Sequence, residues 1–233
     1  MAKIKLIFFD MEGTIFKKAV RLSHTSVAPS AWCALAQRLS PRAYEEERLT
    51  QDKWNKGLYS SYIEWMEETI KIHKKYKLTK SLFLRVIDSI EYMPGVRNVF
   101  KFLNTERIPT CLISGGFKYQ GDKALVDLGI RHSFVACEYF WDKKGYLKSW
   151  NLLPADEEGK LDFMKLIIKE YKFSKTDCAF VGDGENDIPI AKSVGISIAF
   201  NGSPLLQRNA TYSINQRKGK ENLLEILKYL FPF

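Results

Sequence analysis

Short apolar runs alternate with longer amphipathic stretches along most of this chain. The apolar run at residues 3–9 stops at an acidic, glycine-containing turn, which is typical of a buried parallel strand. Further strands are expected at 109–113, 133–137, 178–181, 196–200 and 210–214. Helices are expected near 95–106, after 117, and at 160–171, 188–194 and 221–230. This alternation predicts a parallel sheet covered by helices on both faces.

The segment from about residue 18 to 92 has a different pattern. It contains one glycine, Gly57, and its apolar residues recur at helical spacing, as Ile63, Met66 and Ile70 illustrate. Prolines and capping residues precede its helix-like runs. We therefore expect an insert of four helices.

This change of pattern predicts the domain organisation. We expect one α/β core domain, built from residues 1–16 and 93–233, and one helical domain, built from residues 17–92. Residues 139–150 predict a β-hairpin at one edge of the sheet, because a lysine–glycine turn divides them.

Composition and charge limit the classes of function. The chain has 233 residues, of which 45% are hydrophobic, so it can bury a core and fold. The net charge of +9 raises the question of a nucleic-acid partner. We find no basic helix-turn-helix, no RNP-like strand and no glycine–arginine tract, so we expect no nucleic acid and interpret the lysines as solvated faces that attract anionic substrates.

Cysteine spacing and the first apolar run bear on location. Cys33, Cys111, Cys137 and Cys178 stand far apart, which excludes a zinc site of paired cysteines and a disulfide framework. The first apolar run is cut off by Asp10, too early for a signal peptide or a membrane span. We expect a cytoplasmic protein with no membrane partner, and the pattern does not specify an oligomeric state.

Polar residues follow three of the predicted strands, where doubly wound sheets place their sites. The segments are Asp10-Met11-Glu12-Gly13-Thr14, Ser114-Gly115-Gly116-Phe117 and Gly182-Asp183-Gly184-Glu185-Asn186-Asp187. The first offers two carboxylates. The second offers a hydroxyl and backbone amides to an anion, and the third offers oxygen ligands to a hard cation.

In this order the three segments resemble the motifs of haloacid dehalogenase (HAD)-type phosphatases, and most closely those of the phosphoserine phosphatase-like group. The resemblance implies a HAD-type doubly wound, Rossmann-like parallel sheet core with an inserted α-helical cap domain. It also implies a catalytic lysine. We assign Lys160, because it opens an amphipathic helix that leads to the strand ending at Gly182. Lys143 and Lys144 are expected in the exposed hairpin turn.

The resemblance implies hydrolysis of a small phosphorylated metabolite through an aspartyl-phosphate. Asp10 is the expected nucleophile, and Glu12 is the expected proton donor and acceptor. Ser114, Gly115 and Lys160 are expected to hold the phosphoryl oxygens.

The same resemblance implies Mg²⁺ as the cofactor. Asp10, Asp183 and the backbone carbonyl of Glu12 are the expected ligands, with Asp187 as a further ligand or as a partner of the ligands. Asn186 is expected to orient phosphate or substrate.

Two departures from the group's pattern concern rate and substrate. Glutamate stands at position 12, where aspartate is usual, which keeps the acid but adds one methylene. The group's cap glutamate and cap arginine have no clear counterpart: residues 15–21 contain no acid and residues 54–70 contain no arginine, which leaves Arg21 or Arg48 as substitutes. The substrate is therefore not specified.

Two other functions remain open at this point. A phosphotransferase, passing the phosphoryl group to an alcohol, would use the same residues. A non-catalytic phosphate-binding module would lack the nucleophile, the lysine or the metal ligands, all of which are present. The cap aromatics Trp54, Tyr59, Tyr62 and Trp65, together with Met66, are expected to form cap core rather than a ligand pocket.

Overall fold

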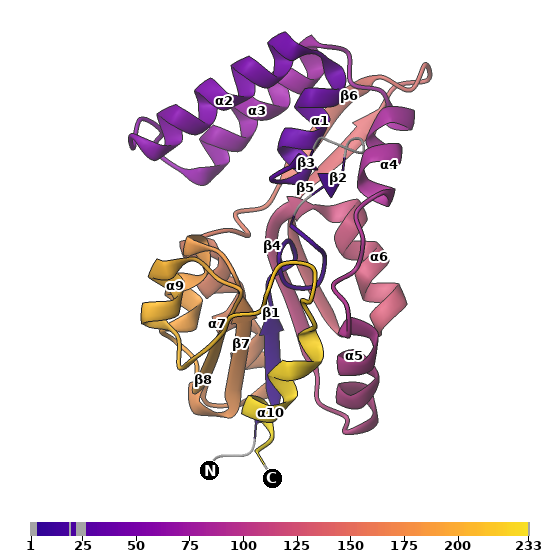
Figure 1. Ribbon diagram of the computed structural model, residues 1–233. Helices are drawn as coiled ribbons and strands as arrows, with labels where there is room; N and C mark the ends of the chain where they lie inside the picture. The colour runs from indigo at the N-terminus through magenta and orange to yellow at the C-terminus, as the bar shows by residue number, and fades with distance from the viewer. Residues whose placement is uncertain (1–3, 19, 22–26, 233) are drawn as a thin grey trace. The chain divides into compact units, whose positions relative to one another are not determined.

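The computed structural model describes residues 4–18, 20–21 and 27–232. The chain forms two compact units (Figure 1). The first consists of Met1–Lys17, Tyr92–Val135 and Ala155–Phe233, and the second of Lys18–Glu91 and Ala136–Pro154.

A seven-stranded sheet carries the order β6-β5-β4-β1-β7-β8-β9. Its strands are β1 Leu6–Phe9, β4 Thr110–Phe117, β5 His132–Trp141, β6 Leu147–Leu152, β7 Cys178–Gly182, β8 Ile196–Phe200 and β9 Tyr212–Ile214. Strand β1 is fully buried and pairs in parallel with β4 and β7. Strands β7, β8 and β9 continue the parallel pairing, whereas β5 and β6 form an antiparallel hairpin at one edge. The predicted parallel sheet with an edge hairpin is confirmed.

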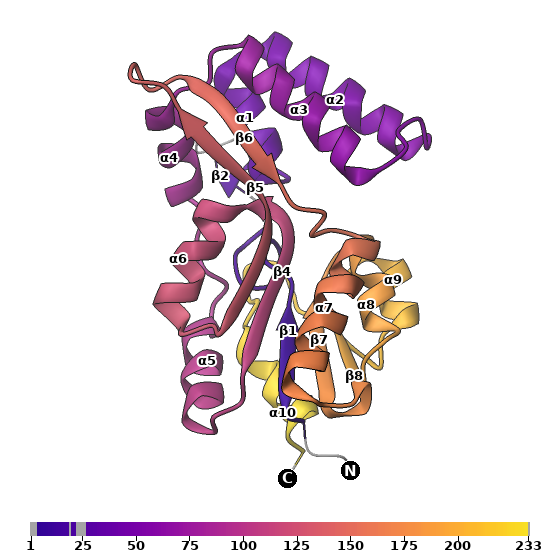
Figure 2. The same ribbon diagram turned by 180° about the vertical axis from the view of Figure 1, so that it is seen from behind.

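Helices cover both faces of this sheet. They are α5 Val96–Thr105, α6 Lys118–Leu128, α7 Glu158–Tyr171, α8 Ile188–Ala191, α9 Pro204–Asn209 and α10 Leu227–Leu230. Single 3-10 turns occur at η1 Lys175–Asp177, η2 Glu185–Asp187 and η3 Leu223–Ile226. Helix α10 stands before the sheet in Figure 1, and α7 stands before it in the opposite view of Figure 2. The core is therefore doubly wound, as expected.

Several boundaries differ from the sequence expectation. Strand β4 continues to Phe117 instead of ending at Ile113, because the glycines after Ser114 accept an extended backbone without contributing an apolar signal. The expected helix at 221–230 is divided into η3 and α10. Helix α8 ends early, at Ala191, and α9 was not predicted.

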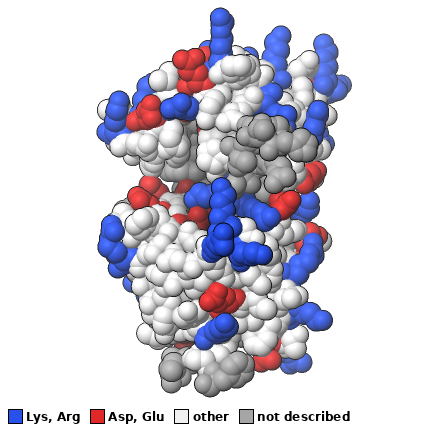
Figure 3. All heavy atoms as spheres, viewed as in Figure 1, with Lys and Arg blue, Asp and Glu red and all other residues white. Residues whose placement is uncertain are grey.

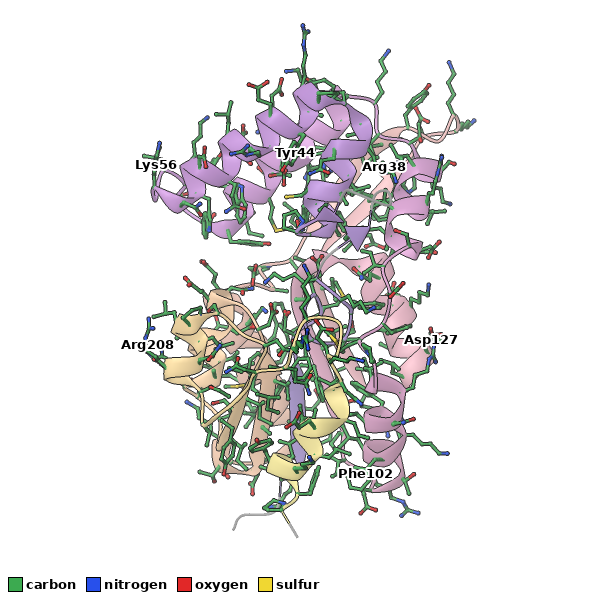
Figure 4. All side chains as sticks on the ribbon, viewed as in Figure 1. Arg38, Tyr44, Lys56, Phe102, Asp127 and Arg208 are labelled. Atoms are coloured by element: carbon green, nitrogen blue, oxygen red, sulfur yellow. The ribbon has the colours of Figure 1, made fainter. Side chains whose placement is uncertain are left out.

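The C-terminal segment packs against α5. The ring centroid of Phe231 lies 5.4 Å from that of Phe102, which Figure 4 labels near the base of α5. Helix α5 also meets α6, where the Asp127 carboxylate lies 3.5 Å from the Arg97 guanidinium.

The second unit contains the four predicted helices. They are α1 Ala31–Leu39, α2 Pro41–Asn55, α3 Tyr62–Lys75 and α4 Lys80–Asp88. Each begins at a hydroxyl residue whose side chain accepts a backbone N–H of the first turn: Ser30, Ser40, Ser61 and Thr79. A two-residue pair of strands, β2 Val20–Arg21 and β3 Val27–Ala28, precedes α1 and was not predicted.

The β5–β6 hairpin packs with these helices. The backbone N–H of Leu147 donates to the carbonyl of Leu78 at 2.9 Å, and Tyr146 forms a bridge with Thr79. Lys74 of α3 donates to the Lys148 carbonyl at 2.9 Å. The compact second unit therefore includes residues 136–154, whereas the sequence analysis assigned all of 93–233 to the core domain.

Aromatic side chains fill the space between α2 and α3. The rings of Trp54 and Trp65 stack with centroids 5.0 Å apart, and Tyr62 meets Trp65 edge-on at 5.4 Å. The Trp65 indole donates to the buried Thr50 hydroxyl at 3.1 Å. These contacts make the aromatic cluster part of the packing between the two helices.

A buried histidine joins α3 to the hairpin. His73 is fully buried, and its Nδ1 lies 2.8 Å from the Tyr139 hydroxyl. The Trp32 ring stacks on it at a centroid distance of 5.9 Å. Its Nε2 has no hydrogen-bond partner among the described residues. Burial lowers the pKa of His73 from 6.5 to about 3, so the imidazole is neutral.

Charged side chains of both signs are interspersed on the face that Figure 3 shows. An exposed turn of the first unit carries Arg217, Lys218 and Lys220. The Lys220 N–H donates to the Arg217 carbonyl at 2.9 Å and closes this turn. None of the helices in the described part of the chain combines the length and apolar content that a membrane crossing requires.

Candidate active site

The carboxyl ends of two neighbouring strands bring acidic residues together. Asp10 directly follows β1 and Asp183 directly follows β7, and these strands are adjacent and parallel. The Asp10 N–H donates to the Val181 carbonyl at 3.0 Å, so the strand pairing holds Asp10 beside β7. Carboxylate oxygens of Asp10, Asp183 and Asp187 all lie within 4.8 Å of one another, and the three residues are buried. The structure thus brings together three of the acids proposed from sequence.

Lys160 places its ammonium between two of these carboxylates. It lies on α7, its side chain is 0% exposed, and Nζ donates to Oδ1 of Asp10 and to Oδ1 of Asp187, each at 2.6 Å. Burial alone would lower the pKa of Lys160, but the surrounding carboxylates, Asp10 foremost, outweigh it and raise that pKa above its ordinary value. Lys160 therefore carries a positive charge. Lys143 and Lys144 are exposed in the hairpin turn.

Asp187 uses its second oxygen to shape the loop after β7. Oδ2 accepts the backbone N–H groups of Asp183 and Gly184, both at 3.0 Å. These bonds hold the backbone of the loop that carries Asp183. Gly13 allows the loop after β1 to approach it: its φ is +86°, and a β-carbon there would overlap the Asp183 carboxylate. The glycine of the first motif is thus explained by close packing between two loops.

The electrostatic balance of the cluster suits a cation. Burial is the main reason that the pKa of Asp10 lies well above its ordinary value; Lys160 opposes the shift, and the charges of Asp187 and Asp183 add to it. The cluster combines three buried acidic side chains with one ammonium, so acids outnumber cations in it. Oxygen ligands at such spacing fit a divalent cation that takes few protein ligands, such as Mg²⁺.

Glu12 and Ser114 approach the same point from different loops. A β-carbon placed at Gly116 would lie 3.5 Å from Glu12 Oε1 and 3.5 Å from Ser114 Oγ, and it would overlap the Met11 side chain. Ser114 is buried at the end of β4, and its hydroxyl accepts the Gly116 N–H at 3.2 Å. The absence of a side chain at Gly116 makes room for the Met11 side chain beside Glu12 and Ser114. Gly115 lies beside Ser114 on the same strand.

Asn186 leads to a residue that the sequence pattern did not single out. Its Nδ2 donates to Oδ1 of Asp156, and Asp156 Oδ1 lies 3.8 Å from the Lys160 ammonium. Asp156 is 7% exposed. The available signal was its spacing, four residues before the chosen lysine.

The proposed substitutes for a cap arginine lie in the second unit. Arg48 is exposed on α2. The Arg21 side chain lies outside the described part of the structure. Glu47 of α2 is buried in the second unit, and its Oε1 accepts a hydrogen bond from the Cys33 thiol at 3.1 Å.

Comparison with known proteins decides the family. Residues 4–195 match the family described as haloacid dehalogenase-like hydrolase. The chain belongs to the haloacid dehalogenase-like hydrolases. This HAD membership, and similarity to several curated phosphoserine phosphatases, confirms the expected class of phosphoric monoester hydrolase.

Two curated relatives of this HAD hydrolase are named phosphoserine phosphatase. The protein from Lactococcus lactis is 30% identical over 154 residues, covering 66% of this chain and 68% of the relative. The protein from Methanocaldococcus jannaschii is 29% identical over 170 residues, covering 68% and 75%.

Solved structures confirm the fold of the HAD core and its insert. A phospho-aspartyl intermediate analogue of phosphoserine phosphatase matches with a TM-score of 0.78 at 24% identity, covering 97% of this chain and 99% of that one. A HAD family hydrolase from Salmonella enterica matches with a TM-score of 0.81 at 17% identity, covering 99% and 72%.

Proposed function

We propose that this chain is a Mg²⁺-dependent phosphatase that hydrolyses a small phosphomonoester through an aspartyl-phosphate on Asp10. The observation that carries the proposal is the buried Lys160 ammonium, 2.6 Å from the carboxylates of both Asp10 and Asp187 at the ends of β1 and β7. Such an arrangement is costly to bury and accounts for little stability, but it suits a dianionic ligand with a cation.

The carboxylates of Asp10 and Asp183, with the Glu12 carbonyl and Asp187, would hold the cation. Bound Mg²⁺ would supply positive charge that neutralises the phosphate. The negative charge of the phosphate also calls for hydrogen-bond donors from the protein. The Ser114 hydroxyl and the Lys160 ammonium would hold phosphoryl oxygens, and the Gly115 N–H would add a fixed donor.

In the first step a carboxylate oxygen of Asp10 attacks phosphorus. The new bond joins that oxygen to phosphorus, and the bond from phosphorus to the substrate alcohol breaks. Glu12, whose Oε1 lies near Gly116 and the Ser114 hydroxyl, gives its proton to the departing alkoxide. In the second step Glu12 takes a proton from water, which attacks phosphorus and releases inorganic phosphate and the free Asp10 carboxylate.

The proposed substrate class is a small phosphorylated metabolite. The names of the curated relatives make phosphoserine the first candidate. Against strict specificity for phosphoserine stands the missing cap arginine between residues 54 and 70. A set of esters is therefore the proper first test.

The test measures phosphate release with Mg²⁺ from phosphoserine and from sugar, nucleotide, polyol and aromatic phosphates. We expect turnover that is lost in Asp10→Asn and kept in Asp122→Asn, a matched change at an exposed carboxylate of the same unit. Mass spectrometry after acid quenching should detect phosphate on Asp10. Metal-dependent turnover by Asp10→Asn would contradict the proposal. Formation of a new phosphate ester on an added alcohol, in place of free phosphate, would indicate a phosphotransferase.

A further inference from the structure

Asp156 lies beside two residues of the proposed phosphate site. We propose that Asp156 is a positioning residue that fixes the side-chain amide of Asn186 and supports the ammonium of Lys160, a role that rests on the proposed phosphatase function. Its carboxylate is buried, and one oxygen, Oδ1, faces three donors. These donors are the Asn186 amide, the Glu157 N–H at 3.0 Å and the Lys160 ammonium at 3.8 Å.

The bond to Asp156 determines which way the Asn186 amide points. An ionised carboxylate accepts hydrogen bonds and donates none, so only the NH₂ end of the amide can face it. The amide oxygen is then held on the opposite side, over Gly184, where a β-carbon would overlap it. Without Asp156, the two ends of the amide could exchange places. Asp156 therefore fixes both the position and the orientation of the group that Asn186 offers to a ligand.

Asp156 also stands behind the ammonium of Lys160. Two of the ammonium protons are engaged by Asp10 and Asp187, each at 2.6 Å. At 3.8 Å, Asp156 is beyond hydrogen-bond distance but within ion-pair distance of the Lys160 ammonium. When Asp10 reacts with a phosphoryl group, the Asp156 carboxylate, which takes no part in the reaction, still attracts the Lys160 ammonium. Asp156 thus joins η2 to the start of α7 through one oxygen.

The contacts of Asp156 differ from those of a residue that only caps a helix. Asp156 lies two residues before α7, and the backbone N–H that it accepts belongs to its own neighbour, Glu157. The bond to Asn186 reaches a residue 30 positions away. A cap would need only the first of these contacts, whereas the contacts with Asn186 and Lys160 both end at the proposed phosphate site.

The experiment compares Asp156→Ala and Asp156→Asn with Asn186→Ala, the double variant Asp156→Ala/Asn186→Ala, and the control Asp162→Asn. Asp162 lies on α7 with a side chain that is 76% exposed and pairs with Lys165. We expect kcat to fall about 10- to 100-fold in Asp156→Ala, with KM changed less than about 3-fold. Because the two residues act together, the double variant should be no slower than the slower single variant.

A measurement without turnover examines the amide itself. In a ¹H–¹⁵N spectrum, the Asn186 NH₂ pair is assigned by its loss in Asn186→Ala. We expect one of its protons to be shifted strongly downfield in the native protein, and this shift to collapse in Asp156→Ala and Asp156→Asn but not in Asp162→Asn. Binding of orthovanadate, a phosphate analogue, should weaken at least about 10-fold in Asp156→Ala.

Each outcome decides one claim. An Asn186 signal unchanged by Asp156→Ala overturns the proposal, as does a changed signal with native kcat and native orthovanadate affinity. Additive losses in the double variant overturn it as well. If the native protein hydrolyses none of the esters, the proposed function fails, and the amide signal together with orthovanadate affinity still decides the role of Asp156.

Discussion

The buried imidazole of His73 makes the stability of the second unit sensitive to mild acid. Its pKa is about 3 in the folded chain and 6.5 in an exposed histidine. Between these values the unfolded state binds one proton more than the folded state, so stability falls as pH falls below about 6.5. Above that pH both states are neutral at this residue, and the effect vanishes.

The size of the effect follows from the unfolded pKa alone over most of this window. A pH of 5 is 1.5 units below the pKa of 6.5 of the unfolded histidine, and each unit corresponds to about 1.4 kcal/mol. The free energy of unfolding should therefore fall by about 2 kcal/mol between pH 7 and pH 5 through His73. The folded pKa lies far below pH 5, so the folded imidazole binds almost no proton across this range.

The assay uses the five tryptophans, all of which belong to the second unit: Trp32, Trp54, Trp65, Trp141 and Trp150. Urea unfolding followed by tryptophan fluorescence at pH 7 and pH 5 gives the loss of stability. His73→Gln changes stability at both values, but that cost cancels in the difference between them. We expect the native protein to lose about 2 kcal/mol more than His73→Gln.

His132 provides the matched control, since it is a partly buried histidine of the first unit, 2.8 Å from the Tyr171 hydroxyl. Burial also lowers the pKa of His132, but less than that of the fully buried His73, so His132→Gln should reduce the pH dependence of the fluorescence transition less than His73→Gln does. Equal losses in the native protein and His73→Gln would refute the reasoning, because His73 would then bind its proton as readily in the folded as in the unfolded state.

Three further changes test the packing that supports the site and the fold. Gly13→Ala combines a φ of +86° with overlap on the Asp183 carboxylate, so we expect at least about a 100-fold loss of phosphatase kcat/KM in a protein with native circular dichroism. Ser61→Ala removes the side-chain oxygen that caps α3, which should cost about 1 kcal/mol in the urea transition seen by tryptophan fluorescence. Met164→Ala empties a fully buried position on α7 and should cost about 2 to 5 kcal/mol by calorimetry, whereas Leu166→Ala, at a position 53% exposed on the same helix, should cost little.

Much of the core could be predicted because its strands are short apolar runs with polar ends. The run before Asp10 is buried on both sheet faces, so its pattern is continuous and its end is sharp. The same sharp ends located Asp183 and Ser114. Parallel pairing then places such residues at one edge, which is why motifs far apart in sequence meet.

Other features depend on contacts that a single sequence does not display. The continuation of β4 through Gly115 and Gly116 is fixed by its neighbours, since glycine has no strand preference of its own. Strand β5 runs without a break from the core into the hairpin because its pairing partner changes along its length, and local pattern does not record a partner. Asp156 was missed since an acid before a helix is common and its decisive contact, with Asn186, is made across 30 residues.

The unbroken course of β5 has a consequence for recombination between relatives. The chain passes from one compact unit to the other after Lys17, Glu91, Val135 and Pro154. A chimera that exchanges residues 18–91 alone would pair a foreign helical insert with the native hairpin, including the Leu78–Leu147 bond. Grafting a specificity from another member therefore requires two fragments, 18–91 and 136–154, to be transplanted together, with one junction falling inside a strand instead of a loop.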